Sequence, residues 1–175
     1  MLDKEGDLSL STINSKMAQM DNRLSGFQSK VEEIYDLNAD KIRFMDATPS
    51  SMPVDGWITS DFGFRRSPYS GVYRMHYGLD IASPTGTIVR APADGKVLFA
   101  DARAGYGREV ILDHGFGVNT VFAHASALFV EEGEKVQRGE PIAAVGSSGA
   151  STGPHLHYEV HIDGIPTDPL AYVMK

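Results

Sequence analysis

Glycine and proline are distributed so unevenly along this chain of 175 residues that one type of fold cannot account for its whole length. Residues 1–48 contain no proline and only Gly6 and Gly26, whereas the remainder holds all nine prolines and sixteen of the eighteen glycines. Because both residue types interrupt helices and favour turns, the first part can form one long helix, while the second must turn often. We therefore predict a helix over 1–45, a linker over 46–56 and a separate domain over 57–175.

Apolar side chains in the first part recur with alternating spacings of three and four residues, which is the heptad pattern of a coiled coil. A helix with one apolar stripe needs a partner, so we expect residues 10–34 to pair with a partner helix or with a second copy of the chain. The alternative is that the stripe packs on the chain's own second domain, and the number of helices stays open. The a and d positions are Leu10, Ile13, Met17, Met20, Leu24, Phe27, Val31 and Ile34.

Composition excludes several classes of function. The net charge is −7, and no basic patch with interleaved aromatic residues occurs, so we expect no nucleic-acid partner. The chain has no cysteine, so any bound metal must be held by His, Asp or Glu. It also lacks a run of 18 apolar residues and an N-terminal signal pattern. We therefore expect no membrane segment in this chain, and an export signal or anchor would lie outside it.

The second part has the pattern of a β domain. Short segments rich in valine and isoleucine are separated by Gly, Pro and Asp turns about every 8–12 residues, which indicates antiparallel strands. Examples are REVILDHG, VNTVFAHAS and HLHYEVHIDG. No helical periodicity longer than about two turns interrupts them. We predict a compact, mainly β domain whose strands form packed or partly closed sheets.

Two pairs of residues in this β domain have spacings that suit a metal site. His155 and His157 share one face of a strand, with Cα atoms about 6.6 Å apart, so their imidazoles can converge. His76 and Asp80 stand four residues apart, about 13 Å in a straight strand. Gly78 between them permits the bend that would bring them together. Spacing alone leaves open which of His155 and His157 is a ligand.

These motifs resemble the lysostaphin/LytM-type zinc metallopeptidases, enzymes that cleave peptide bonds in bacterial peptidoglycan. The resemblance covers about residues 57–173 and implies a compact antiparallel β-sheet peptidase domain of the duplicated-hybrid-motif type, preceded here by a long N-terminal α-helix. The phrases that carry it are HYGLD, VFAHAS and GPHLHYEV, supported by SDFGFRRSP, APADGKV, ILDHGFG, GSSGASTG and DPLAYV.

Carried over by position, the resemblance implies a zinc site and two catalytic histidines. His76, Asp80 and His157 would bind the zinc, while His124 and His155 would be catalytic residues beside it. The resemblance thus decides the question that spacing leaves open. It implies a zinc-dependent endopeptidase acting on peptidoglycan, in the periplasm or cell envelope of a bacterium. The alternative is a non-catalytic coiled-coil regulator or scaffold of cell-wall hydrolases.

Other residues near these motifs receive weaker assignments. Phe122 stands where the family often has tyrosine, a departure that should leave the zinc site intact, and a further family tyrosine would be Tyr69 or Tyr73. Glu159 has the parity to share the strand face of His155 and His157, where it would orient a ligand or be merely structural. We expect His161 to point outward or to end the strand, and His114 to be a turn residue with a structural hydrogen bond.

Overall fold

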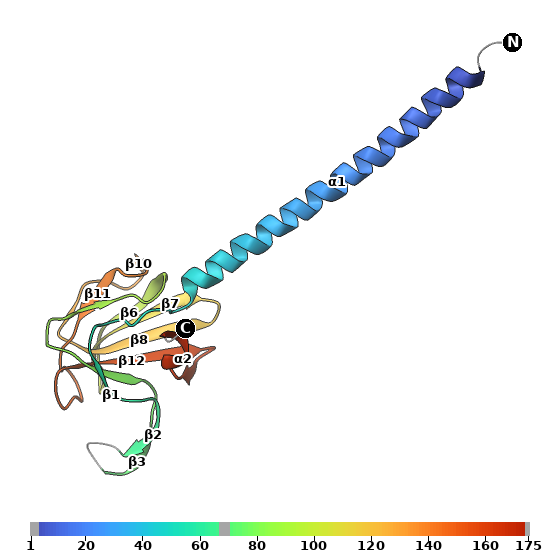
Figure 1. Cartoon of the computed structure of the whole chain (residues 1–175). Coiled ribbons are helices and arrows are strands. Elements are labelled where there is room, and N and C mark those ends of the chain that lie inside the picture. The colour runs from blue at the N-terminus through green and yellow to red at the C-terminus, as the bar shows by residue number, and fades with distance from the viewer. Residues whose placement is uncertain (1–3, 67–70, 174–175) are drawn as a thin grey trace. The chain divides into compact units, whose positions relative to one another are not determined.

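The computed structural model describes residues 4–66 and 71–173, divided between two compact units, Met1–Arg43 and Phe44–Lys175. The first unit is helical, and the second is built mostly of antiparallel strands (Figure 1). The predicted fold class, a mainly β domain preceded by a long N-terminal helix, is therefore confirmed.

The helix α1 (Lys4–Ala47) runs without interruption, as expected for a segment without proline. Its heptad side chains are exposed along the whole stripe, from 38% for Val31 to 74% for Met20. Their pairing with a second helix stays a prediction. No helix among the described residues combines the length and the apolar character needed to cross a membrane.

The last turn of α1 belongs to the second unit, and Arg138 caps it. The Nη2 atom of Arg138 donates to the carbonyl oxygens of Met45 at 2.7 Å, Asp46 at 3.1 Å and Thr48 at 3.2 Å. The last carbonyls of a helix have no partner within it and carry partial negative charge, so a guanidinium there is favourable.

The segment between α1 and the first strand packs on the β domain rather than hanging free. Val54 is only 4% exposed and belongs to the core. The backbone N–H of Arg90 donates to the Pro53 carbonyl at 2.8 Å. Of the predicted linker 46–56, Asp46 and Ala47 still belong to α1. The rest is irregular in backbone but is held by burial and by hydrogen bonds.

The strands form one large sheet, a small sheet and a hairpin. The large sheet has the order β1-β4-β12-β8-β7-β6-β10, with β13 paired to β12, while β5-β11-β9 and β2-β3 form the other two. All recorded pairings are antiparallel. The elements are β1 (Trp57–Ser60), β2 (Gly63–Arg66), β3 (Tyr73–His76), β4 (Leu79–Ala82), β5 (Ile88–Arg90), β6 (Gly95–Arg103), β7 (Gly107–Gly115), β8 (Val118–Ala125), β9 (Ala127–Leu128), β10 (Lys135–Val136), β11 (Pro141–Ala144), β12 (His155–Ile162), β13 (Ile165–Thr167) and α2 (Leu170–Val173).

The strand β12 lies between β4 and β8 in the large sheet, and Figure 1 shows it beside β8. Its two faces have different roles. Leu156, Tyr158 and Val160 are at most 1% exposed and belong to the hydrophobic core. The ring of Tyr158 stacks on that of Phe122 of β8, with centroids 5.4 Å apart. Because side chains alternate along a strand, the histidines of β12 face the opposite way, and the buried core fixes the backbone that carries them.

Candidate metal centre and active site

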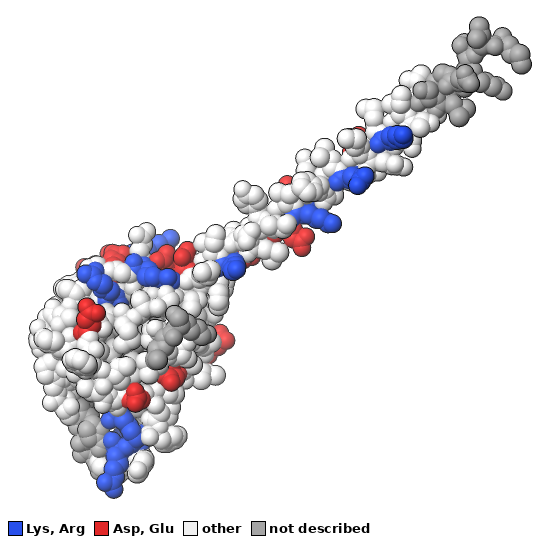
Figure 2. Space-filling view, in the orientation of Figure 1, with Lys and Arg blue, Asp and Glu red and all other residues white. Residues whose placement is uncertain are grey.

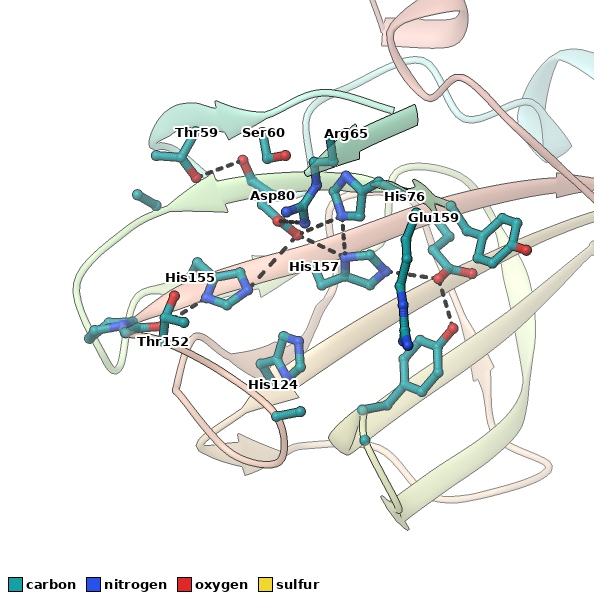
Figure 3. Close-up of a pocket in the computed structure, with 18 of the residues that line it drawn as sticks. Thr59, Ser60, Arg65, His76, Asp80, His124, Thr152, His155, His157 and Glu159 are labelled. Carbon is teal, nitrogen blue, oxygen red and sulfur yellow. Dashed lines mark hydrogen bonds and ion pairs between the residues drawn. The ribbon is translucent and has the colours of Figure 1, made fainter. Parts of the chain in front are cut away.

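Strand pairing brings the predicted ligands together from distant parts of the sequence. In the register of β12 with β4, His157 lies directly opposite Asp80. His76 is the last residue of β3, and two residues join it to the start of β4. Figure 3 shows the side chains of these three residues pointing toward one another at the centre of the site.

The three side chains form a tight triangle of donor atoms. His157 Nδ1 lies 2.8 Å from Asp80 Oδ1, and His76 Nε2 lies 3.1 Å from the same oxygen and 3.2 Å from His157 Nδ1. The side chains of His76, His157 and Asp80 are 8%, 11% and 14% exposed. The expected ligands therefore meet at one point that is largely shielded from water.

This triangle has the dimensions of one face of a tetrahedral metal site. Zinc binds nitrogen and oxygen ligands at about 2.0–2.2 Å, which puts neighbouring tetrahedral donors about 3.3 Å apart. The observed separations of 2.8, 3.1 and 3.2 Å are close to that value. Two imidazoles and one carboxylate form a donor set that suits zinc and leaves a fourth position for water or substrate.

Hydrogen bonds determine which nitrogen of each ligand histidine faces the triangle. His76 Nδ1 lies 2.8 Å from the carbonyl oxygen of Asp61. Since a carbonyl only accepts, this nitrogen is an N–H donor, and Nε2 is the nitrogen that faces the triangle. His157 has the opposite arrangement, because its Nε2 lies 2.8 Å from Glu159 Oε1 and its Nδ1 faces the triangle.

Charge in the metal-free site is set by the same contacts. Burial opposes ionisation of Asp80, but hydrogen bonds from His157 and His76 outweigh it and hold the pKa of Asp80 well below its usual range. Burial likewise opposes the charged form of His157, yet its bonds to Asp80 and Glu159 raise its pKa to about 9. For Glu159, burial is outweighed by bonds from His157 and His161, and its pKa falls to about 2.

The two predicted catalytic histidines lie beside the triangle, and each ring contacts a main-chain carbonyl through its Nδ1 atom. His124 Nδ1 lies 2.8 Å from the Ser148 carbonyl oxygen, and His155 Nδ1 lies 2.8 Å from that of Gly153. Both Nδ1 atoms are therefore N–H donors, which leaves each neutral Nε2 as a proton acceptor. The ring centroids of His124 and His155 are 4.8 Å apart, and burial lowers the pKa of His124, which favours its neutral form.

Glu159 connects the ligand His157 to a second layer of polar side chains. Its Oε1 accepts a hydrogen bond from the Tyr106 hydroxyl at 3.0 Å, and its Oε2 lies 2.6 Å from His161 Nε2. Burial and the nearby Glu159 carboxylate raise the pKa of Tyr106 to about 12, so this hydroxyl remains a donor. His161 shares the face of Glu159, because side chains two residues apart on a strand face the same way. Of the two positions expected for it, it lies near the end of the strand, next to last in β12, and does not point outward.

Other sequence expectations fall outside the site. His114 lies on β7, where its ring nitrogens contact the Asp94 carbonyl at 2.6 Å and Thr120 Oγ1 at 2.7 Å, which is a structural role. Tyr73 is 69% exposed on β3, and Tyr69 lies outside the described residues.

The site opens into a cleft with a volume of about 740 Å³. The five predicted site residues all line it, from β3, β4, β8 and β12. Sequence reasoning missed Tyr106, Arg65 and Arg74, which also line it. Tyr106 stands between two glycines in AGYGRE, a pattern that predicts a turn but gives no sign of a cleft side chain.

The β fold and a His-Asp-His centre flanked by two imidazoles are those of a metallopeptidase. The model of peptidase family M23 matches residues 74–169, which is more than half of the chain. The chain therefore belongs to peptidase family M23, and the resemblance seen in its motifs is confirmed.

Individual relatives agree with this assignment. The chain is 48% identical over 117 residues to the DD-carboxypeptidase/endopeptidase Mpg of Neisseria meningitidis serogroup B, a match that covers 67% of this chain and 27% of that protein. It resembles a zinc-containing peptidase from Vibrio cholerae with a TM-score of 0.65 and 35% identity, over 69% of this chain and 39% of that one. It also resembles the catalytic domain of lysostaphin from Staphylococcus simulans, with a TM-score of 0.61 and 29% identity, over 66% of this chain and 90% of that domain. This chain thus spans only 27% of the length of the Neisseria relative.

The bend at Gly78 generates a first prediction. A Cβ atom at this position would lie 2.5 Å from the Tyr158 carbonyl oxygen and 2.9 Å from His157 Cε1. Gly78→Ala should therefore destabilise the domain by about 1–3 kcal/mol and weaken zinc binding, measured by denaturant unfolding and by chelator competition. Gly26→Ala is the matched control, since a Cβ there meets nothing within 4 Å. Zinc affinity equal to that of the unchanged protein in Gly78→Ala would contradict this reading.

The charge of His157 generates a second prediction. With a pKa of about 9, His157 is protonated at pH 7 in the metal-free protein and must lose its Nδ1 proton to bind a metal. Calorimetric titration with zinc at pH 7, in buffers of different ionisation enthalpy, should report release of about one proton per ion, and the affinity should rise with pH up to about 9.

The same proton affects the stability of the metal-free fold. The pKa of His157 is raised above its ordinary value of 6.5, so its contribution is fully present below pH 6.5 and is lost as the pH rises through 9. In the zinc titration described above, a binding enthalpy that is the same in every buffer at pH 7 would show that His157 is already neutral and would contradict both expectations.

Proposed function

We propose that this chain is a zinc-dependent endopeptidase that hydrolyses peptide bonds in bacterial peptidoglycan. The observation that carries the proposal is the donor triangle of His76, Asp80 and His157 on one cleft with two further imidazoles whose Nε2 atoms are unprotonated when neutral. The names of the relatives support the substrate, since they include peptidoglycan DD-endopeptidases of Vibrio cholerae. Peptidoglycan as substrate implies an extracytoplasmic location, in the periplasm or cell envelope.

In this proposal His76 Nε2, Asp80 Oδ1 and His157 Nδ1 hold the zinc. When bound, the ion supplies Lewis acidity for the scissile carbonyl and lowers the pKa of a water molecule to about 7. Glu159 accepts the Nε2–H of His157 and keeps the Nδ1 lone pair directed at the ligand triangle. Asp61 does the same for His76 through its carbonyl oxygen.

His124 and His155 act as the proton-transfer groups. Each holds its Nδ1 proton on a backbone carbonyl, so each Nε2 can take a proton from the attacking water and later give it to the leaving amine. His155 Nε2 lies 3.9 Å from Asp80 Oδ1, which puts it beside the ligand triangle. An imidazolium here would also stabilise negative charge that develops on the scissile carbonyl oxygen.

The competing function is a non-catalytic regulator or scaffold of other cell-wall hydrolases. Such a role needs the fold and the helix, but it does not need a complete ligand set. The retention of all five site residues on one cleft favours catalysis over this alternative.

Two substitutions separate the ligand role from the catalytic role. His157→Ala should lower zinc affinity by well over a hundredfold, because losing a group that only orients a ligand already costs about 10–100-fold. His155→Ala should keep its zinc but lose about 10²–10⁴-fold in turnover. The measurements are zinc content after dialysis and release of soluble fragments from peptidoglycan.

Both variants should keep the circular dichroism spectrum of the unchanged protein. A His155→Ala protein that digests peptidoglycan at the normal rate would remove His155 from the mechanism. Zinc-loaded unchanged protein that releases no fragments would favour the regulator.

For the helix we propose pairing with a second copy of this chain in parallel orientation through residues 10–34. The g positions Lys16, Arg23 and Lys30 are all basic, and an antiparallel pair would set g against g with like charges facing. In a parallel pair g faces the following e position, so Lys16 meets Asp21 of the second copy, and Arg23 and Lys30 meet uncharged residues. Charge therefore favours the parallel arrangement.

Sedimentation of the full chain tests this pairing. We expect dimers at micromolar concentration, dissociated by Leu24→Glu at an a position and unaffected by Ser29→Glu on the opposite side of the helix. The chain lacks cysteine, so in the Val31→Cys variant a disulfide can join only the two introduced cysteines. It should form only in a parallel dimer, where position 31 of one copy faces position 31 of the other. A monomer at about 100 µM, far above the micromolar dissociation constant proposed, would refute the pairing.

A further inference from the structure

Two arginines face each other across the β2–β3 hairpin at the mouth of the cleft. Arg65 and Arg74 are directly opposed in the register of the two strands, so their side chains lie on the same face. Both line the cleft, whereas the neighbouring Arg66 does not. Figure 2 shows basic side chains gathered over this hairpin, on a chain whose net charge is −7.

The positive charge of this pair is only partly neutralised by contacts within the described residues. Like charges directly opposite on antiparallel strands destabilise the pairing. Arg65 Nη2 donates to Asp80 Oδ2 at 3.0 Å, but its Nε is buried without a hydrogen-bond partner. The side chain of Arg74 is exposed, and no hydrogen bond or ion pair joins its guanidinium to another described residue. The buried Arg65 Nε is thus an unsatisfied donor, while the exposed guanidinium of Arg74 is open to a bound ligand.

The cleft itself offers no further anion to these arginines. Its acidic lining residues are Asp80 and Glu159. Asp80 gives Oδ1 to the ligand triangle and Oδ2 to Arg65, and Glu159 is bound through both oxygens to His157, Tyr106 and His161. Both carboxylates are therefore engaged, so a further anionic partner for these guanidinium groups has to come from a bound molecule.

The position of this pair relative to the triangle indicates what it binds. Arg65 and His157 contact the two oxygens of the same Asp80 carboxylate, so the guanidinium lies one carboxylate width from the proposed zinc position (Figure 3). A substrate group bound by this guanidinium would therefore belong to a residue next to the scissile peptide bond, which lies at the proposed zinc position. Guanidinium groups bind carboxylates with paired, charge-assisted hydrogen bonds.

We propose that Arg65 and Arg74 form a subsite for a free carboxylate on the residue next to the scissile peptide bond. The subsite rests on the proposed peptidase function and narrows its substrate. A cross-link whose leaving residue carries a free carboxylate fits it. A bridge of glycines, which has no carboxylate beside the bond that is cut, does not.

Paired substrates test the subsite. We would prepare two cross-linked stem-peptide dimers that differ only in the group next to the scissile amide, a free carboxylate in one and a carboxamide in the other. Zinc-loaded protein should cleave the carboxylate form with a KM lower by about tenfold or more, the value of one charge-assisted hydrogen bond. Added salt should raise the KM for that form only.

Substitution of Arg74 assigns the effect to this residue without disturbing the contact of Arg65 with Asp80. Arg74→Met should raise the KM for the carboxylate form by about tenfold and leave the carboxamide form unchanged. Arg74→Glu should raise the KM for the carboxylate form further, because its negative charge repels the carboxylate of the substrate. Arg66→Met on the same hairpin is the matched control, and unfolding temperature checks that each variant is folded.

Binding provides a readout that does not depend on turnover. In the zinc-loaded His155→Ala background, the dissociation constant of the carboxylate form should rise on Arg74→Met and that of the carboxamide form should not. Equal KM values for both substrates, or equal effects of Arg74→Met on both, would overturn the subsite while leaving the peptidase intact. Cleavage of neither substrate, with peptidoglycan also undigested, would instead overturn the proposed function.

Discussion

The site depends on one constraint, which is that every imidazole at the cleft has one ring nitrogen fixed on an acceptor. Main-chain carbonyls of Asp61, Ser148 and Gly153 hold the Nδ1–H groups of His76, His124 and His155. The carboxylate of Glu159 holds Nε2 of His157. Each ring is thereby held in one orientation, and its other nitrogen faces the cleft. The proposed metal ligands differ from the proposed proton acceptors only in whether that nitrogen faces the triangle.

The strand β12 couples this polar arrangement to the stability of the fold. Its even-numbered residues Leu156, Tyr158 and Val160 are buried in the core, while its odd-numbered residues form the site. A one-residue slip in pairing would exchange the two sets, so burial of the core strongly specifies the register that puts His157 opposite Asp80. The chemistry therefore depends on apolar residues that never touch the cleft.

Much of this arrangement can be predicted from the sequence. The heptad spacing and the absence of proline predict the helix. Short segments rich in valine and isoleucine, separated by Gly, Pro and Asp turns, predict the β domain. The parity of His155 and His157 puts them on one face, and HYGLD suggests the second half of the site. Motif resemblance was needed to separate His155 from His157, because both have the same parity and both are near the metal position.

Other features had no sequence signal that could be interpreted physically. The carbonyl groups that fix the imidazoles belong to the main chain, so any residue type can supply them. Tyr106 reaches Glu159 only because the β6–β7 connection lies beside β12 in space. The opposition of Arg65 and Arg74 depends on the register of a hairpin, which neighbouring residues do not determine.

Anomalous diffraction at the zinc absorption edge, from crystals of the zinc-loaded protein, tests the central claim most directly. The account predicts one strong peak within about 2.0–2.2 Å of His76 Nε2, Asp80 Oδ1 and His157 Nδ1, with the rings of His124 and His155 close by but not bound to the ion. A peak bound through His157 Nε2, or one that recruits His155 in place of His157, would contradict it.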